Sequence, residues 1–331
     1  MIKITLGLVT YNQSTFKYLE HFFSSLKVSL SLALEKWPNL DFKIAVFDNS
    51  DSNYQDNYNY LKEEDRVVKI FRSEVNLGFA KAYNQLIQWS LEQEDQFFLM
   101  LNPDILVDKD FLREIIEVIL KESEVAVLAP KIYYWDFVNK AKTRIIDSCG
   151  LGLSRAHYFF DRGQGKLDQL DYRDQEEIFG FTGAGALINL ERIKKIAYNE
   201  KEFFDEMMFM YKEDIDLSYR LQIAGEKIVF VPKAILYHDR SLGKSKWRQL
   251  FKLKNRNQSR QQSFLNQLII LYKIRKLPFS WKTRVFSGGR CLLLIIYAFI
   301  FARQALKEFR QIRRDIRIHV GDVKRIERFM V

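Results

Sequence analysis

The sequence predicts an α/β fold with a mostly parallel sheet flanked by helices, followed by a basic helical extension at the C-terminus. Two observations predict the sheet. Apolar runs alternate with longer amphipathic segments through the first 130 residues, and polar motifs follow directly after several of these runs. A change of charge along the chain predicts the extension. With 331 residues, of which 47% are hydrophobic, the chain can fill a large core.

The apolar runs place the strands, and the amphipathic segments place the helices between them. The N-terminal stretch MIKITLGLVTYN has no basic lead-in and no small-residue cleavage site, so we interpret it as a buried first strand. Strands are expected near residues 2–9, 42–48, 67–71, 96–101 and 125–129. Helices are expected near residues 15–36, 76–93 and 109–122.

The pattern changes after residue 130. Residues 131–177 are irregular, aromatic and charged, as expected of an insertion that shapes a cleft, and we extend this insertion to residue 184. Regular structure returns with IFGFTGAGALINL, a glycine-containing strand. A helix is expected to begin near Tyr211 and to end at Gly225, with the strand IVFVP after it.

Charge divides the chain into two parts. Residues 241–331 carry 22 Lys and Arg against 4 Asp and Glu, which leaves 30 basic and 38 acidic residues in the first 240. An acidic body is thus joined to a tail that is suited to an anionic surface. The two cysteines, Cys149 and Cys291, are far apart and outside any Cys/His cluster, so neither a disulfide framework nor a zinc site is indicated.

Four polar motifs follow predicted strands or open helices: VTYN at 9–12, DNSD at 48–51, NLGF at 76–79 and LNPD at 101–104. Ligands of mostly parallel sheets bind at the carboxyl ends of the strands, so these motifs should face one crevice. In LNPD, the carboxylate of Asp104 can hold Mg²⁺ or Mn²⁺ and so stabilise a departing diphosphate. An isolated Asn-Pro-Asp is more often only a turn, so this interpretation depends on the other motifs.

Three acids, Glu213, Asp214 and Asp216, fall in the first turn of the helix predicted near Tyr211. Helix caps and the helix dipole account for one or two of them. The third is in excess, and we take Asp214 as a candidate general base that removes the proton of an attacking hydroxyl. His238 follows the strand IVFVP, where an imidazole can ligate a metal or bind diphosphate, although a lone histidine is more often a packing residue.

Taken together, seven motifs resemble the family-2 glycosyltransferases of the GT-A fold in content and order, over roughly residues 3–243. The likeness is closest to the branch that contains bacterial rhamnosyltransferases. It implies an inverting transfer from a nucleoside-diphosphate sugar to a saccharide acceptor, in cell-surface polysaccharide synthesis. The motifs are VTYN, DNSD, NLGFAKAYN, LNPD, GFTGAGALI, YKEDIDLSYRLQIAG and YHDRSLG.

The resemblance also implies roles for single residues. Asp214 is the general base, with Glu213 and Asp216 on the acceptor side. A metal, Mg²⁺ or Mn²⁺, is held by Asp104 and His238. The residues implied in nucleotide and donor binding are Thr10, Tyr11, Asn12, Asp48, Asn76, Gly78, Lys81, Asn102, Asp104, Gly183 and Ala184.

The sequence departs from the family's pattern at two positions. Asn102 replaces the first Asp of the common Asp-x-Asp metal motif, although NPD is itself common in this branch, and nothing in the sequence explains Asp51 in DNSD. Two other functions are open to a chain of this kind. A sugar nucleotidyltransferase would need a glycine- and basic-rich loop after the first strand, which VTYNQSTF lacks. An inactive binding module is disfavoured because Asp104, Asp214 and His238 are present.

The sequence divides into a glycosyltransferase domain at 1–243 and a membrane-associating segment at 244–331. The run CLLLIIYAFIFA (291–302) would reach only about 18 Å as a helix, short of a roughly 30 Å hydrocarbon core. This run and FLNQLIILYKIRK (264–276) are expected to lie in the interface, with Lys and Arg on anionic head groups. The alternative is that both pack on the body.

Long aliphatic runs in this segment argue against nucleic acid as the partner. A peripheral position at the cytoplasmic face of a bacterial plasma membrane would bring Asp214 to a polyprenyl-diphosphate-linked acceptor, such as relatives extend. Rhamnose from dTDP-rhamnose is the donor that the resemblance favours.

Overall fold

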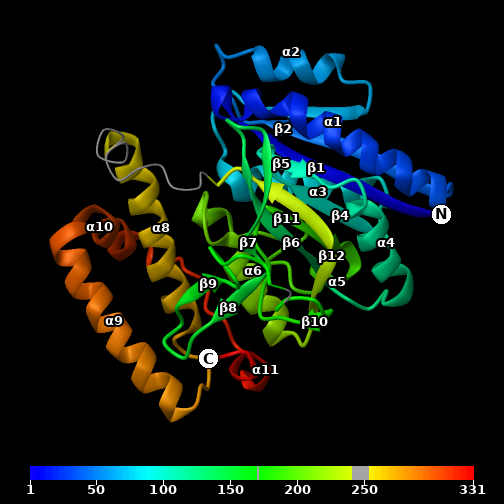
Figure 1. Ribbon diagram of the computed structural model, residues 1–331. Helices are drawn as coiled ribbons and strands as arrows, with labels where there is room; N and C mark the ends of the chain where they lie inside the picture. Colours follow the sequence, from blue (N-terminus) through cyan, green and yellow to red (C-terminus); the bar gives the residue numbers. More distant parts are fainter. Residues whose placement is uncertain (170, 241–252) are drawn as a thin grey trace.

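The computed structural model describes residues 1–169, 171–240 and 253–331 (Figure 1). The predicted domain boundary at 243/244 lies outside these residues. The N-terminal elements are β1 (Ile2–Thr10), α1 (Asn12–Lys36), β2 (Leu40–Asp48), α2 (Asp56–Glu63), β3 (Val67–Arg72), α3 (Gly78–Glu92), β4 (Phe97–Leu101), β5 (Ile105–Val107) and α4 (Phe111–Lys121).

The later elements complete the sheet and add the C-terminal helices. The central ones are β6 (Val127–Asp136), β7 (Ala141–Ser148), β8 (Leu151–Leu153), β9 (Phe159–Asp161), β10 (Glu176–Glu177), β11 (Gly185–Asn189), α5 (Leu190–Lys194), the 3-10 turn η1 (Glu206–Met208), α6 (Glu213–Ile223) and β12 (Ile228–His238). The C-terminal ones are α8 (Leu253–Ile274), α9 (Trp281–Phe301), α10 (Arg303–Ile312) and α11 (Lys324–Glu327).

The main sheet has the strand order β10-β12-β6-β11-β4-β1-β2-β3. Strand β1 pairs in parallel with β2 and β4, β2 with β3, and β12 with β6. Strand β11 is antiparallel to both of its neighbours, β4 and β6. The prediction of a mostly parallel sheet flanked by helices is confirmed.

Alternation of side chains along the strands divides the core between the two faces of the sheet. Ile4, Leu6 and Leu8 of β1 pack with the apolar side chains of α1 and α4. Phe98 and Met100 of β4 point to the other face and pack with α3 and α6. Successive residues of a strand point to opposite faces, so buried strands that are apolar throughout need a helical layer on each side.

The predicted irregular region contains regular structure that the sequence analysis missed. Strand β6 continues to Asp136 and pairs antiparallel with β7, where Tyr133 lies opposite Ile146. Strands β8 and β9 form a second antiparallel pair. The expectation of an irregular 131–177 is therefore wrong for these strands, and helix α2 was not expected either. Strands β7, β8 and β9 form because they pair with other strands of the fold, and their own sequences carry no strong strand pattern.

Helix α8 corrects the expectation that residues 264–276 lie in a membrane interface. Leu265, Ile269 and Ile270 are buried and share an apolar cluster with Phe179 and Tyr219 of the body. The alternative, that this stretch packs on the body, holds for α8. Burial is favoured because it removes these apolar side chains from water.

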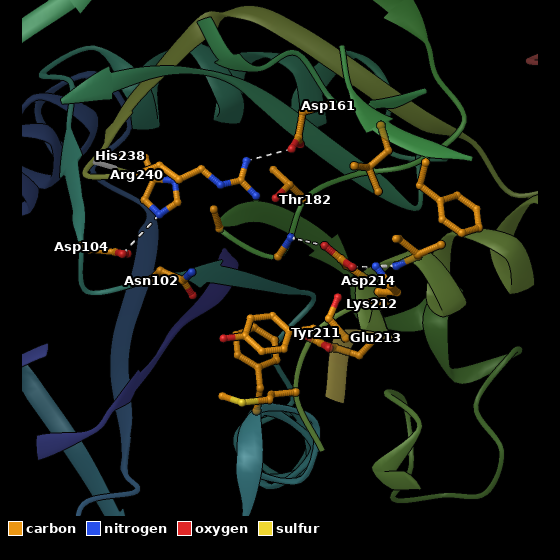
Figure 2. A pocket seen from close by; sticks show the side chains of 18 of the residues that line it. Asn102, Asp104, Asp161, Thr182, Tyr211, Lys212, Glu213, Asp214, His238 and Arg240 are labelled. Atoms are coloured by element: carbon orange, nitrogen blue, oxygen red, sulfur yellow. Dashed lines mark hydrogen bonds and ion pairs between the residues drawn. The ribbon is translucent and has the colours of Figure 1, made fainter. Parts of the chain in front are cut away.

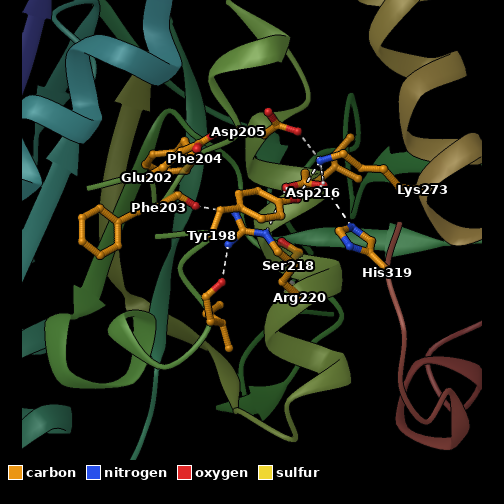
Figure 3. Close-up of polar contacts among 12 residues, drawn as sticks. Tyr198, Glu202, Phe203, Phe204, Asp205, Asp216, Ser218, Arg220, Lys273 and His319 are labelled. Carbon is orange, nitrogen blue, oxygen red and sulfur yellow. Dashed lines mark hydrogen bonds and ion pairs between the residues drawn. The ribbon is translucent and has the colours of Figure 1, made fainter. Parts of the chain in front are cut away.

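A buried ion cluster ties α8 to the body (Figure 3). The ammonium of Lys273, which is fully buried, pairs with the carboxylates of Asp205 and Asp216, 2.6 Å from the latter. Asp216 also bonds Arg220 at 3.1 Å and His319 at 3.0 Å. Burial alone would raise the pKa of Asp216, but Lys273 and Arg220 hold it well below its usual range.

We expect Lys273→Met to lower the free energy of unfolding by about 3–5 kcal/mol, because it leaves two buried carboxylates short of their cation. Lys276→Met is the matched control: Lys276 is exposed three residues further on, so its loss should change stability by less than about 0.5 kcal/mol. Denaturant titration of both variants checks this. Equal stability of the two would contradict a structural role for the cluster.

Candidate active site

A cavity of about 600 Å³ opens beside the carboxyl ends of β4 and β12 (Figure 2). Its walls come from segments far apart in the sequence: the loop after β4, the start of β11, the first turn of α6, the end of β12 and the β8–β9 pair. The predicted site residues that line it are Asn102, Asp104, Gly183, Ala184, Glu213, Asp214 and His238.

One wall is built around His238. Strand β12 pairs with β5 so that His238 lies opposite Ile105, which brings the imidazole next to Asp104. His238 Nε2 is 3.3 Å from Asp104 Oδ2, and Nδ1 is 2.8 Å from Asp147 Oδ2. Burial would lower the pKa of His238, but the carboxylates of Asp104 and Asp147 raise it to about 10. Without a metal, this imidazole is therefore a cation at neutral pH and suits an anionic group.

The same wall bears on metal binding. Among the described residues, no group of three or more His, Cys, Asp and Glu side chains could hold a metal ion. Asp104 and His238 offer one carboxylate and one imidazole, and Asn102 lies beside them. Mg²⁺ is commonly bound by one or two carboxylates with substrate phosphates and water completing the shell, so this pair fits a metal shared with a diphosphate. Asp147 would orient the histidine, as carboxylates often do for metal-binding imidazoles.

The other wall carries Asp214. The backbone N–H of Gly183 donates to Asp214 Oδ2 at 2.8 Å, and the N–H of Ile215 donates to Oδ1 at 2.8 Å. Burial raises the pKa of Asp214, and these two hydrogen bonds partly oppose the rise. The carboxylate is thus held in a fixed orientation at the cavity, with a stronger affinity for a proton than an exposed aspartate.

Glu213 also lines the cavity, but its side chain is buried and Oε2 has no hydrogen-bond partner among the described residues. Burial and the neighbouring Asp214 raise its pKa. Two adjacent carboxyls in such a site do not both ionise easily. The two N–H donors at Asp214 favour its ionised form, so the neutral partner is Glu213.

Asp216 does not lie on the acceptor side, and that expectation is wrong. It is fully buried in the cluster with Lys273 and Arg220, outside the cavity lining. The reason is helical geometry. Two residues correspond to about 200° around an α-helix, so Asp214 and Asp216 point in nearly opposite directions.

The motifs at the ends of β1 and β2 come together but do not line this cavity. Thr10 Oγ1 donates to Asp48 Oδ1 at 2.9 Å, and both residues are fully buried. Tyr11 is exposed. Asn12 and Asp51 form two hydrogen bonds. Asn12 Nδ2 donates to Asp51 Oδ2 at 2.7 Å, and the N–H of Asp51 donates to Asn12 Oδ1 at 3.0 Å. Asp51, unexplained in the sequence, therefore joins the two motifs.

The NLGF motif forms the start of α3. Asn76 Oδ1 accepts from the N–H of Gly78 at 2.8 Å, and Gly78 adopts a φ of 78° that suits glycine. The N–H groups of Phe79 and Ala80 donate to the carbonyl of Phe209, so a protein oxygen caps this helix end. Asn76, Gly78 and the exposed Lys81 lie outside the cavity lining, and their contact with a donor stays a prediction.

Three residues of the site were not predicted from the sequence. Arg240 bridges Asp147 at 3.1 Å and Asp161 at 2.8 Å, and both Arg240 and Asp161 line the cavity. Arg240 lies within YHDRSLG, so its motif was visible. Asp147 and Asp161 lie in β7 and β9, which carry no local signal of function.

The fold can be compared with those of known proteins. The search of curated proteins found no match to this sequence. A structure of GalNAc-T7 with UDP, GalNAc and Mn²⁺ aligns with a TM-score of 0.59 at 14% identity, over 96% of this chain and 56% of that one. TarS from S. aureus aligns with a TM-score of 0.51 at 14% identity, over 92% of this chain and 44% of that one. The chain thus spans about half the length of these two proteins.

These likenesses show the GT-A fold. A fragment of S. aureus TarS, residues 1–349, aligns over 97% of this chain and 94% of the fragment, again with a TM-score of 0.51 at 14% identity. The model of glycosyl transferase family 2 matches residues 5–196, which is more than half of the sequence. The chain belongs to glycosyl transferase family 2.

Proposed function

We propose that this protein is an inverting glycosyltransferase that moves a sugar from a nucleoside-diphosphate donor to a saccharide acceptor, with Asp214 as general base. The observation that carries the proposal is the cavity itself. It has an oriented carboxylate of raised pKa on one side and the Asp104–His238 pair on another (Figure 2). These are the two functions that a single displacement needs.

In this displacement, an acceptor hydroxyl gives its proton to Asp214 while its oxygen bonds to the anomeric carbon of the donor sugar. The bond from that carbon to the diphosphate breaks, and the nucleoside diphosphate leaves toward Asp104 and His238. Attack from the face opposite the leaving group inverts the anomeric centre. Among the described lining residues, neither a Ser-His-Asp nor a Cys-His arrangement offers a competing nucleophile.

Asp104 and His238 would hold a divalent cation, Mg²⁺ or Mn²⁺, together with the diphosphate of the donor. Such an ion neutralises charge on the leaving group. A His238 that binds the metal is neutral, so Arg240 is the residue that supplies positive charge to the same anion from the protein side. GalNAc-T7 was solved with UDP and Mn²⁺, which supports a metal-assisted donor site here.

The resemblance to the rhamnosyltransferase branch supports dTDP-rhamnose as donor and a polyprenyl-diphosphate-linked glycan as acceptor, in bacterial cell-surface polysaccharide synthesis. We place the protein at the cytoplasmic face of the plasma membrane. Helix α9 supports this placement. Its residues Leu292, Leu293, Ile296 and Ile300 are each 49–67% exposed, and Lys307 and Arg310 of α10 are exposed near its end.

Helix α9 also corrects an expectation about length. Residues 291–301 of the apolar run belong to a helix of 21 residues, and among the described residues this helix is the one long and apolar enough to cross a membrane. Arg290 lies at the middle of this helix and donates to the carbonyls of Ala156 and His157 on the body. A charged residue tied to the body at mid-helix is costly in a bilayer centre, so we favour a helix lying in the interface.

Replacing Asp214 with Asn keeps the shape of the side chain but removes the proton acceptor. Turnover should fall by roughly a hundredfold or more while nucleotide binding stays near normal, because the change acts on the transition state. Release of nucleoside diphosphate from a panel of UDP-, GDP- and dTDP-sugars measures this. Full activity of the variant would pass the role to Glu213, and no release by the unmodified protein would favour an inactive binding module.

Metal dependence is tested by titrating the protein with UDP, GDP and dTDP in Mn²⁺ and in EDTA. Asp104→Ala should abolish the gain in affinity that Mn²⁺ gives, since it removes the one carboxylate ligand. His238→Ala should weaken binding less. Asp65→Ala is the matched control, because it removes an exposed carboxylate that lies outside the cavity lining. Equal affinity in Mn²⁺ and EDTA would make the enzyme metal-independent.

The membrane position is tested by sedimentation with anionic vesicles. The full chain should sediment with phosphatidylglycerol vesicles, and part of the binding should survive high salt, because screening weakens only the electrostatic part. Changing Leu293 and Ile300 to Glu should release the protein. Changing Val68 and Val138 to Glu, two exposed valines of the body, adds the same charge as a control and should not. A full chain that stays in the supernatant at low salt would refute the membrane position.

A further inference from the structure

Helix α8 lies outside the residues matched by the family model, yet it reaches the site. Ser263 lines the cavity. Three more polar residues of α8 share one face of the helix, because their spacings are four and seven residues. They are Gln262, Asn266 and Lys273. All three side chains bond to the segment between Asp205 and Asp216, which contains Asp214.

Asn266 makes the central contacts. Its side chain is fully buried, and Nδ2 lies 2.7 Å from the carbonyl of Met208, 2.8 Å from that of Met210 and 2.7 Å from that of Tyr211. Gln262 Nε2 adds a bond to the carbonyl of Met208 at 3.2 Å. An amide nitrogen has two hydrogens, so three carbonyls share this donor.

The loop that Asn266 holds has an unusual backbone. Phe209, Tyr211 and Lys212 have φ angles of 53°, 71° and 71°, in the left-handed region that non-glycine residues rarely adopt. Each such residue costs on the order of 1 kcal/mol or more and persists only where surrounding contacts impose it. Buried carbonyls in such a loop also need donors from elsewhere, and α8 supplies them.

Lys273 holds the same segment at both ends. Its ammonium pairs with Asp205, before the loop, and with Asp216, in the first turn of α6 (Figure 3). Asp214 therefore lies between two attachment points on α8: the Asn266 contacts end three residues before it, and the Lys273 contact comes two residues after it. The position of Asp214 relative to the cavity is therefore fixed by contacts before it and after it in the chain.

We propose that Asn266 and Lys273 are positioning residues, through which α8 holds the 205–216 segment so that Asp214 faces the cavity. This inference rests on the proposed function for the role of Asp214, but the hold on the segment does not. It also implies that the helix after the catalytic body is part of the catalytic unit and not a separable anchor.

The test uses Asn266→Ala and Asn266→Asp in the full chain, because a Lys273 variant is expected to lose stability. Gln267→Ala is the matched control. Gln267 is the next residue, is also buried, and its Nε2 has no hydrogen-bond partner among the described residues. Asn266→Asp should loosen the segment more than Asn266→Ala, since it replaces the donor with a carboxylate that faces three carbonyl oxygens.

The first readout is amide hydrogen exchange of peptides covering residues 205–217. We expect exchange at least about tenfold faster in both Asn266 variants, and unchanged in Gln267→Ala, because local opening follows the loss of the contacts that hold a segment closed. The second readout is donor hydrolysis with UDP-, GDP- and dTDP-sugars. The Asn266 variants should lose roughly ten- to a hundredfold in kcat with KM for the donor within twofold, as expected of a misplaced base.

Unchanged exchange in the Asn266 variants overturns the inference, and so does a kcat equal to that of Gln267→Ala. A parallel loss of kcat, donor binding and melting temperature also overturns it, since that pattern reports general destabilisation. If the unmodified protein hydrolyses none of the donors, the proposed function has failed, and the exchange readout still decides whether α8 holds the segment.

Discussion

The orientation of α6 depends on the burial of Asp216. A fully buried carboxylate must be paired, and Asp216 meets this requirement with Lys273, Arg220 and His319. Once that face of the helix is committed to the cluster, the position two residues earlier must face the opposite way. The candidate base Asp214 therefore faces the cavity because Asp216 faces the buried cluster.

The wall of the cavity around His238 depends on strand pairing. Antiparallel pairing of β12 with β5 sets His238 beside the loop that carries Asp104, and β7 adds Asp147 behind the imidazole. His238 and Asp147 come from two strands, and Asp104 lies in the short turn between β4 and β5, so the sheet fixes this geometry. Asp214, in contrast, follows a loop with three left-handed residues and needs contacts from α8.

The basic extension has two physical roles in this structure. Helix α8 is buried against the body and belongs to the same apolar cluster as α6. Helix α9 leaves large aliphatic side chains exposed over most of its length, with Arg290 fastening its middle to the body. Both helices carry basic residues and an apolar run, and packing separates a core helix from a surface that suits a lipid interface.

Local pattern alone determined the parallel half of the sheet and helices α1, α3 and α4 that cover it, because strand and helix periods are encoded within short windows. It also determined the chemistry of LNPD, the acidic start of α6 and His238. Tertiary structure alone decided β7 to β9, the burial of α8, and the different fates of Asp214 and Asp216. Those outcomes depend on contacts between distant segments: β6 with β7, Lys273 with Asp216, and Asn266 with the loop before α6. A short stretch of sequence around α6 does not include Lys273 or Asn266. It therefore cannot show that Asp216 is paired in the core while Asp214 remains free to react.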